Sequence, residues 1–452
     1  MRNSRYDVLP KSGQPALPHV VVVGGGFGGL TLVRQLARER RRGNLLARIT
    51  LVDRHNHHTF QPLLYQVASA GLQPQDVGIS LRAILRRHRI ENRLGEVVGI
   101  DTEARQVHLS DETTLDYDHL VLAAGAITED FGIPGVAEHA FGLKSLPEAT
   151  TLRNEILRRF EEVSAQPHRA ADGSLTFVIA GGGPTGVELA GALAELVDLV
   201  VRRDHPTLDI GQVKILLVEP RNRLLGGFSS VSGDAAVSGL CRRGVDVRLG
   251  VGIAQADTDH VELTNGEVVA TRTLVWAAGV SGSPLAETLG VELGRSRRVP
   301  VDQHLRVQGL EAVFAIGDLA AGIDNDGQPL PQVAPVAIQQ AKHVARVLTD
   351  QQAGRATRPF RYRDKGSMAT IGRAAAVTEL PGRIRLRGLT AWLAWLLLHL
   401  LMLVGFRNRV AVLGSWIWNY ATYDHSARLI LDQREAATAE TRRGPVPRSW
   451  AS

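Results

Sequence analysis

Residues 19–29 read HVVVVGGGFGG, and this stretch decides the fold. Its four valines are typical of a buried parallel strand, and the glycines that follow permit a tight turn. Apolar residues then recur at helical spacing, and a second apolar strand at 48–52 ends in Asp53. Asp53 lies about 24 residues after Gly29, close to the spacing of about 20 in dinucleotide-binding folds. The stretch therefore predicts a strand–turn–helix–strand unit that binds a dinucleotide.

A second copy of this unit lies further along the chain. Residues 175–180 (LTFVIA) lead into the glycine turn 181–186 (GGGPTG), and the strand 213–218 (VKILLV) ends in Glu219. One glycine turn alone gives weak support, because such turns also serve only as tight turns. Two turns framed by the same strands, helices and terminal acids predict two Rossmann-type units that bind two dinucleotides face to face.

The residue types in these units fit phosphate and ribose chemistry. Glycines let the backbone approach a pyrophosphate, and a helix N-terminus adds free N–H groups and partial positive charge. Asp53 and Glu219 are placed to accept hydrogen bonds from ribose hydroxyls, although either acid is otherwise a solvated turn carboxylate. Glu219 would repel a 2′-phosphate, which favours NADH over NADPH, while Arg221 and Arg223 nearby soften this preference.

Three later segments resemble strands that return to these sheets, at 120–125 (LVLAAG), 274–279 (LVWAAG) and 313–318 (VFAIGD). Asp318, at the end of the last strand, is placed either to hold the ribityl hydroxyls of a flavin or to cap a helix. The predicted cofactor-binding residues are Gly24, Gly26, Gly28, Gly29, Asp53, Gly125, Asp318, Gly181, Gly183, Gly186, Glu219 and Gly279.

We therefore predict an α/β fold with two nested Rossmann-like dinucleotide-binding domains and a C-terminal membrane-associating region. The first domain is discontinuous, and the first sheet is expected to resume near residue 275 after the second unit. The expected bounds are 18–135 with 275–350 for the first domain, 140–274 for the second, 355–433 for the C-terminal region, and 1–17 with 434–452 for two flexible tails.

Composition narrows the class of protein. The 452 residues are 44% hydrophobic and 22% charged, which excludes a disordered chain, a collagen-like fibre and a polytopic membrane protein. The net charge of +6 would attract anionic partners, but no nucleic-acid motif accompanies it, so nucleic-acid binding is rejected. Cys241 is the single cysteine, which excludes a redox dithiol or an iron–sulfur cluster, and no metal site is predicted. Residues 1–17 lack the apolar region of a secretory signal, so the protein is expected in the cytoplasm.

The C-terminal hundred residues contain a long apolar segment. Residues 389–406 (LTAWLAWLLLHLLMLVGF) carry no charge, and arginines flank both ends. Eighteen residues are at the short end of the length that spans a bilayer, and His399 falls near the middle. The pattern favours a helix that lies in the membrane interface, with 410–420 as a second such element. A spanning helix and a soluble core or dimer interface are the alternatives.

The sequence from about residue 19 to about residue 431 resembles the type II NADH dehydrogenases, which are single-subunit NADH:quinone oxidoreductases that pump no protons. The glycine turns mark only the wider flavoprotein superfamily. More specific motifs are TFQPLLYQVA at 59–68, KGSMATIGR at 365–373, and HLLMLVGFRNR through WIWNY at 399–420. The superfamily also contains disulfide reductases and sulfide:quinone oxidoreductases, and the single cysteine excludes both for this chain.

The resemblance implies roles for residues and cofactors. The first fingerprint would hold FAD and the second NADH, with Glu188 near the junction of flavin and nicotinamide, unless Glu188 is only a first-turn acid that favours the helix dipole. Relatives frame the quinone pocket with an Ala-Gln-x-Ala-x-Gln helix, but here Pro335 replaces the first glutamine. Gln339, Lys365, a backbone group or water is then left to contact the quinone. The predicted catalytic residues are Glu188, Gln339 and Lys365.

The resemblance also implies a function and a location. The protein would be a homodimer peripheral to the cytoplasmic face of the cell membrane, where it oxidises NADH and reduces menaquinone or ubiquinone. Hydride would pass to FAD and two electrons to the quinone, because the cofactors carry the chemistry and no protein nucleophile is needed. The alternatives are an FAD-dependent NAD(P)H reductase with a soluble acceptor and a non-catalytic NADH-binding redox sensor.

Overall fold

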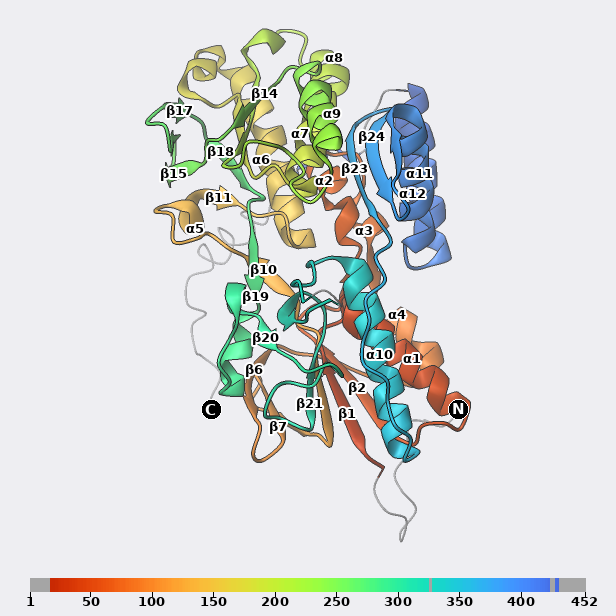
Figure 1. The fold of residues 1–452 in the computed structure, drawn as a ribbon. Helices are drawn as coiled ribbons and strands as arrows, with labels where there is room; N and C mark the ends of the chain where they lie inside the picture. Colours follow the sequence, from red (N-terminus) through yellow and green to blue (C-terminus); the bar gives the residue numbers. More distant parts are fainter. Residues whose placement is uncertain (1–16, 325–326, 423–426, 431–452) are drawn as a thin grey trace, which may run out of the picture.

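The computed structural model describes residues 17–324, 327–422 and 427–430, which form two α/β units and a C-terminal sheet with two helices (Figure 1). Each α/β unit is built on a five-stranded parallel sheet. Almost all of the two tails predicted at 1–17 and 434–452 lies outside the described residues. The α/β class with two Rossmann-like sheets is confirmed.

The first sheet contains the valine run of the first fingerprint. Its strands follow the order β21 (Val313–Ala315), β9 (His119–Leu122), β1 (His19–Val23), β2 (Arg48–Asp53) and β5 (Glu91–Leu94). The valines of β1 are buried on both faces, as expected for the centre of a parallel sheet. Helices α1 (Phe27–Arg41) and α10 (Ala334–Gln352) pack against each other on one face. The antiparallel strands β6 (Val97–Asp101), β7 (Gln106–Leu109) and β8 (Thr114–Asp116) form a separate small sheet.

The second sheet repeats this plan with the second fingerprint at its centre. Its order is β11 (Ala140–Phe141), β18 (Thr273–Trp276), β12 (Thr176–Ala180), β13 (Lys214–Glu219) and β14 (Val245–Leu249). Helices α6 (Leu146–Ala165), α7 (Pro184–Leu196) and α9 (Ser230–Cys241) pack around it. The boundary expected at residue 275 falls inside β18, whose backbone bonds hold it in this second sheet.

Two antiparallel strands connect the units, β10 (Ala126–Thr128) and β19 (Val280–Gly282). The chain therefore leaves the first unit through β10 and returns through β19, a few residues later than the expected boundary. The remaining short strands and α-helices of the described chain are β3 (His57–Thr59), α2 (Leu64–Ala68), α3 (Pro74–Val77), β4 (Gly78–Ser80), α4 (Leu81–Leu85), α5 (Val136–His139), α8 (Arg202–Asp204), β15 (Ile253–Ala256), β16 (His260–Leu263), β17 (Val268–Ala270), β20 (Val299–Pro300) and β22 (Ala320–Ala321).

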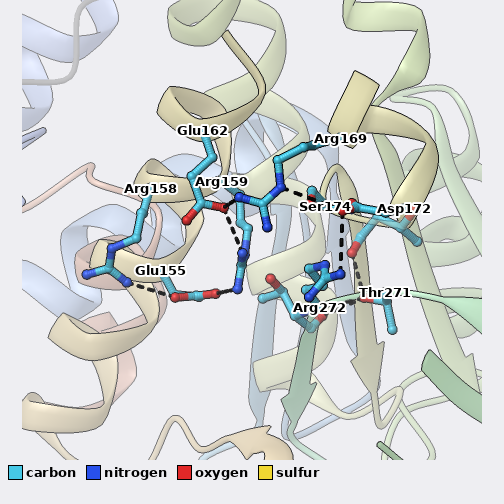
Figure 2. Close-up of polar contacts among 11 residues, drawn as sticks. Glu155, Arg158, Arg159, Glu162, Arg169, Asp172, Ser174, Thr271 and Arg272 are labelled. Atoms are coloured by element: carbon cyan, nitrogen blue, oxygen red, sulfur yellow. Dashed lines mark hydrogen bonds and ion pairs between the residues drawn. The ribbon is translucent and has the colours of Figure 1, made fainter. Parts of the chain in front are cut away.

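A chain of ion pairs fastens α6 to the start of β18 (Figure 2). Glu155 pairs with Arg158 at 2.9 Å and also with Arg159, which in turn pairs with Glu162 at 2.8 Å. The series continues through Arg169 and Asp172 to Arg272, with N–O distances of 3.4 to 3.6 Å. Partly buried networks of this kind hold geometry better than isolated surface pairs do. They fix the position of the long helix α6 against the second sheet.

The C-terminal region is a three-stranded antiparallel sheet under two helices. The strands are β23 (Ser367–Gly372), β24 (Ala375–Leu380) and β25 (Ile384–Arg387), and the helices are α11 (Gly388–Met402) and α12 (Phe406–Thr422). One side of the sheet packs on α7 and α9, and the helices lie on its outer side (Figure 1). Buried Asn408 ties α12 to the first unit by donating to the backbone oxygens of Gln75, Asp76 and Gly78 at 2.9 to 3.2 Å.

The charge-free run at 389–406 is not a single helix, which corrects one expectation. Helix α11 ends at Met402, because Leu403 is extended and Gly405 adopts a φ of +90°, a conformation that favours glycine and ends helices. No helix in the described ranges is long and apolar enough to cross a membrane. His399, which falls near the middle of this run, stacks on buried Trp395 with ring centroids 3.9 Å apart.

Candidate functional site

The first glycine turn forms an open cradle between β1 and α1. Helix α1 begins without a side-chain cap and without an acid in its first turn, so its positive end is available to an anion. A Cβ built on Gly26 meets no atom within 4 Å, whereas one on Gly29 would lie 1.8 Å from the carbonyl oxygen of Gly24. Gly26 therefore leaves space for a ligand, and Gly29 allows α1 to pack closely against the turn.

Asp53 supports this cradle from the end of β2. Its Oδ2 accepts a hydrogen bond from the N–H of Gly25 at 2.5 Å, and its Oδ1 accepts one from the N–H of His55 at 2.6 Å. The carboxylate thus positions the glycine turn and also lines the space beside it. This arrangement brings together the acid and the glycines that the sequence places about 24 residues apart.

A cleft of about 810 Å³ opens from the first cradle toward the ends of the neighbouring strands. Asp318 lines it and pairs with Lys144 at 3.2 Å, and Gln332 donates to the backbone oxygen of Asp318 at 3.0 Å. The predicted cofactor-binding residues that line this cleft are Gly24, Gly26, Gly28, Asp53, Gly125 and Asp318. The size and polar lining suit a dinucleotide. Lys144 was not predicted, because it lies outside the glycine motifs.

The second cradle repeats the geometry of the first. The Oε2 of Glu219 accepts from the N–H of Gly182 at 2.6 Å, and its Oε1 accepts from the N–H of Arg221 at 3.0 Å. A Cβ on Gly183 meets no atom within 4 Å, and one on Gly186 would lie 1.9 Å from the oxygen of Gly181. Gly279 lies under the ring of Phe131, so a side chain there would require that exposed ring to move. Both fingerprints therefore have a hydrogen bond from the second glycine to the acid at the strand end. In both, the third glycine leaves open space, and the last glycine contacts the backbone oxygen of the first.

Glu188 lies on α7 beside a small cavity of about 50 Å³ under the C-terminal helices. Burial raises the pKa of its carboxyl to about 8, because the charged form loses its hydration. The N–H of Thr370 donates to its Oε1 at 3.2 Å, which partly offsets this effect. At neutral pH the group is mostly protonated, so it is able to donate a proton.

Residues from three distant segments meet at this cavity. Tyr65 is hydrogen-bonded to Thr370 at 3.1 Å, and Gln66 accepts from the indole N–H of Trp416 at 2.8 Å. Asn419 donates to the oxygen of Gly71 at 2.8 Å. Sequence reasoning quoted these segments as motifs but did not single out these side chains. The sequence signal that could have identified them is the presence of polar residues within apolar runs. Such residues are expected to be buried and therefore to form hydrogen bonds with partners elsewhere in the chain.

Gln339 and Lys365 lie apart from this cavity. Both atoms of the Gln339 amide bond the backbone of Arg363, at 2.9 and 3.0 Å. Lys365 is exposed and lies two residues further along the same segment. The adjacent Gln340 is buried and accepts from the N–H of Gly317 at 2.6 Å, directly before Asp318. Pro335 occupies the first turn of α10, where a proline fits without losing a helical hydrogen bond.

Comparisons with known proteins agree with this geometry. The profile of the pyridine nucleotide-disulphide oxidoreductase family matches residues 18–341, and that of the NDH2 C-terminal domain matches residues 365–421. The type II NADH:quinone oxidoreductase Ndh of Mycobacterium tuberculosis is 36% identical over 96% of this chain and 94% of its own length. The chain belongs to the type II NADH:quinone oxidoreductases.

Further similarities support the membership of this family. The type II NADH:quinone oxidoreductase NdhA of Mycobacterium tuberculosis is 38% identical over 90% of this chain and 88% of its own length. A structure of NDH2 from Plasmodium falciparum in complex with NADH has a TM-score of 0.81 and 20% identity, and covers 92% of this chain and 100% of that one. This structure shows that the fold of the type II enzymes extends through the C-terminal sheet and helices.

Proposed function

We propose that the first cradle binds FAD and the second binds NADH, so that the chain oxidises NADH and reduces a membrane quinone. The observation that carries this proposal is the repeated cradle, in which an acid at a strand end holds a glycine turn. The bonds Asp53–Gly25 and Glu219–Gly182 differ by only 0.1 Å in length. The resemblance of the whole chain to type II NADH:quinone oxidoreductases supports the choice of substrates.

The residues of the first cradle fit a flavin dinucleotide. The free N–H groups at the start of α1 would face the pyrophosphate, and Gly26 leaves the space that it needs. Asp53 would accept from ribose hydroxyls while keeping its bond to Gly25. Asp318 and Lys144 would contact the ribityl hydroxyls at the other end of the cleft. When bound, FAD supplies hydride acceptance and electron transfer to quinone, which no side chain provides.

Glu188 would hold the proton that quinone reduction consumes. Its carboxyl group is a protonated acid that lines the small cavity, and the C-terminal helices cover that cavity. Gln339 would act indirectly, because its amide fixes the backbone at Arg363 and thereby the segment that carries Lys365. The acceptor would be menaquinone or ubiquinone.

The helices α11 and α12 expose an apolar face that suits a membrane surface. We define this apolar face by its exposed side chains: Leu389, Leu393, Leu397, Leu401, Phe406, Val410, Leu413, Ile417 and Trp418. Contiguous apolar surface of this kind marks an interaction site, and flanking arginines favour the headgroup region. We propose that it docks the enzyme on the cytoplasmic face of the cell membrane, which disfavours an enzyme with a soluble acceptor. The homodimer stays a prediction.

Matched substitutions in the two cradles test the assignment. Gly26→Val and Gly183→Val each place a Cβ where no protein atom lies within 4 Å, so the new Cβ itself meets no protein atom. Gly26→Val should be purified without yellow colour. Gly183→Val should keep its flavin but resist bleaching by NADH. Loss of flavin from the Gly183→Val protein alone would reverse the assignment, and two fully active variants would refute it.

A further inference from the structure

An arginine patch lies on the first unit, outside the predicted cofactor cleft and the C-terminal region. It comprises exposed residues of α1, of the turn after it, of α4, and of the helical turn η2 (Arg86–His88) with the residue that caps its end. The members of this arginine patch are Arg34, Arg38, Arg41, Arg42, Arg82, Arg86, Arg87 and Arg89. Of these eight arginines, only Arg42 forms an ion pair within the described ranges, with Glu39 at 3.2 Å.

The fold holds these like charges close together. Arg40, at the end of α1, donates to the backbone oxygens of His88 and Arg89 at 2.8 and 2.7 Å. Arg41 contacts the ring nitrogen of His88 at 2.9 Å. The pKa of His88 is lowered by burial and then by Arg41, Arg34 and Arg87, so the patch disfavours a further positive charge. The nearby acid Glu91 faces Arg48 at 3.4 Å, outside the patch, so the ion pair of Arg42 with Glu39 is the one that the described residues give the patch.

The patch adjoins the turn between α11 and α12. Asn408 is bonded to the backbone at 75–78, in α3 and at the start of β4, and Gly405 packs on Ile79 of β4. Phe406, which is 83% exposed, projects at the same end of α12. This end of the apolar face therefore lies beside β4, the strand that leads into α4 and Arg82, and Figure 1 shows α1 and α4 below these helices on the same side of the molecule.

We infer that the arginine patch binds the headgroups of anionic phospholipids and gives the enzyme a preference for negatively charged bilayers. This inference rests on the proposed membrane docking and extends it to a surface outside the C-terminal region. A bilayer fits better than an acidic protein, because the charged patch continues an apolar face that a lipid surface would also cover. Arginine binds phosphate groups in a forked geometry, and anionic leaflets attract clusters of basic residues.

Vesicle binding by the full-length, flavin-loaded protein tests this inference. The unmodified protein is compared on phosphatidylcholine vesicles and on phosphatidylcholine vesicles that contain phosphatidylglycerol. The patch variant is Arg86→Gln with Arg87→Gln. The control variant is Arg105→Gln with Arg295→Gln, which removes the same charge from exposed positions in other elements. Activity with a water-soluble quinone analogue should be equal in all three proteins, which shows that each is folded.

The inference predicts that the unmodified protein prefers the anionic vesicles and that added salt weakens this preference. The patch variant should lose affinity for anionic vesicles by about tenfold or more, given the usual gain from each arginine near such a surface. Its affinity for phosphatidylcholine should not change, and the control should behave like the unmodified protein. Equal losses of vesicle affinity in the patch and control variants, or equal binding of the unmodified protein to both kinds of vesicle, would overturn the inference on the arginine patch. Either result would leave the proposed membrane docking in place. Binding to neither vesicle would overturn the membrane docking as well.

Discussion

Glu188 is enclosed by α7, Thr370 and the C-terminal helices, and this environment controls its protonation. Because its pKa is raised to about 8, the carboxyl is protonated at neutral pH and becomes charged as the pH rises through 8. If it donates the proton to quinone, the rate of flavin reoxidation should fall above pH 8 in the natural enzyme. Rapid mixing across pH 6 to 10 with Glu188→Gln as the comparison checks this expectation, since the variant should be slow and lack that transition. The same transition in both proteins would exclude Glu188.

Glu219 is the residue expected to choose between the two nicotinamide cofactors. Its carboxylate holds the N–H groups of Gly182 and Arg221, and a 2′-phosphate beside it would be repelled. Glu219→Gln keeps the shape and removes the charge, so the preference for NADH over NADPH should fall by about tenfold, the usual effect of losing one hydrogen bond to a charged group. Steady-state kinetics with both cofactors measure the ratio. The double variant with Arg221→Ala should restore discrimination against NADPH, and unchanged ratios in both proteins would refute the assignment.

Single residues were predictable where the chemistry is local. Asp53 and Glu219 follow the last glycines of their turns by 24 and 33 residues, and each ends the strand that comes after the helix. Tyr65 and Thr370 could not be paired from the sequence, because more than three hundred residues separate them and only packing brings them together. Gln339 was selected from its place in a motif. The sequence does not show that both atoms of its amide form hydrogen bonds with the backbone of Arg363.

At the scale of elements, α11 and α12 carry the most distinctive prediction. Leu397 is 59% exposed on the apolar face, and Leu46 is 60% exposed on the loop between α1 and β2. Leu397→Gln should weaken binding to phosphatidylcholine vesicles by about tenfold, because a buried leucine side chain contributes about 1.5–3 kcal/mol. Leu46→Gln is the matched control and should bind normally. Vesicle sedimentation measures the affinity of both variants for the vesicles. A similar loss of affinity in the two variants would indicate a general effect of surface polarity and contradict a specific role of the apolar face.

The strands and helices around the fingerprints were predictable from periodicity, but the break between helices α11 and α12 was not. Its apolar run continues through Leu403 to Phe406, so the pattern alone does not show a break. The break arises because Gly405 adopts a left-handed conformation against Ile79 and Asn408 anchors the next helix. Glycine near a helix end was the available signal. The sheet at 367–387 has short strands, which sequence reasoning left undescribed.

At the scale of the whole molecule, the two cradles belong to different sheets, and the C-terminal region contacts both units. Glu379 of β24 accepts from the N–H of Ser229 at 3.0 Å at the start of α9, and Asn408 binds the segment 75–78 of the first unit. These contacts place the helices that we propose to dock on the membrane over the cavity that contains Glu188. The nested order of the two units was predicted from the later segments that resemble strands returning to the two sheets, whereas the crossover after β18 required the structure.

The central claim is that electrons from NADH reach a membrane quinone through this chain. Anaerobic rapid mixing of the flavin-loaded protein in liposomes tests it most directly, with NADH added first and a menaquinone or ubiquinone analogue second. The account predicts fast bleaching of the flavin absorbance by NADH, followed by its fast return when quinone is added. Bleaching without return for every quinone would contradict the claim and favour a soluble acceptor or a sensing role.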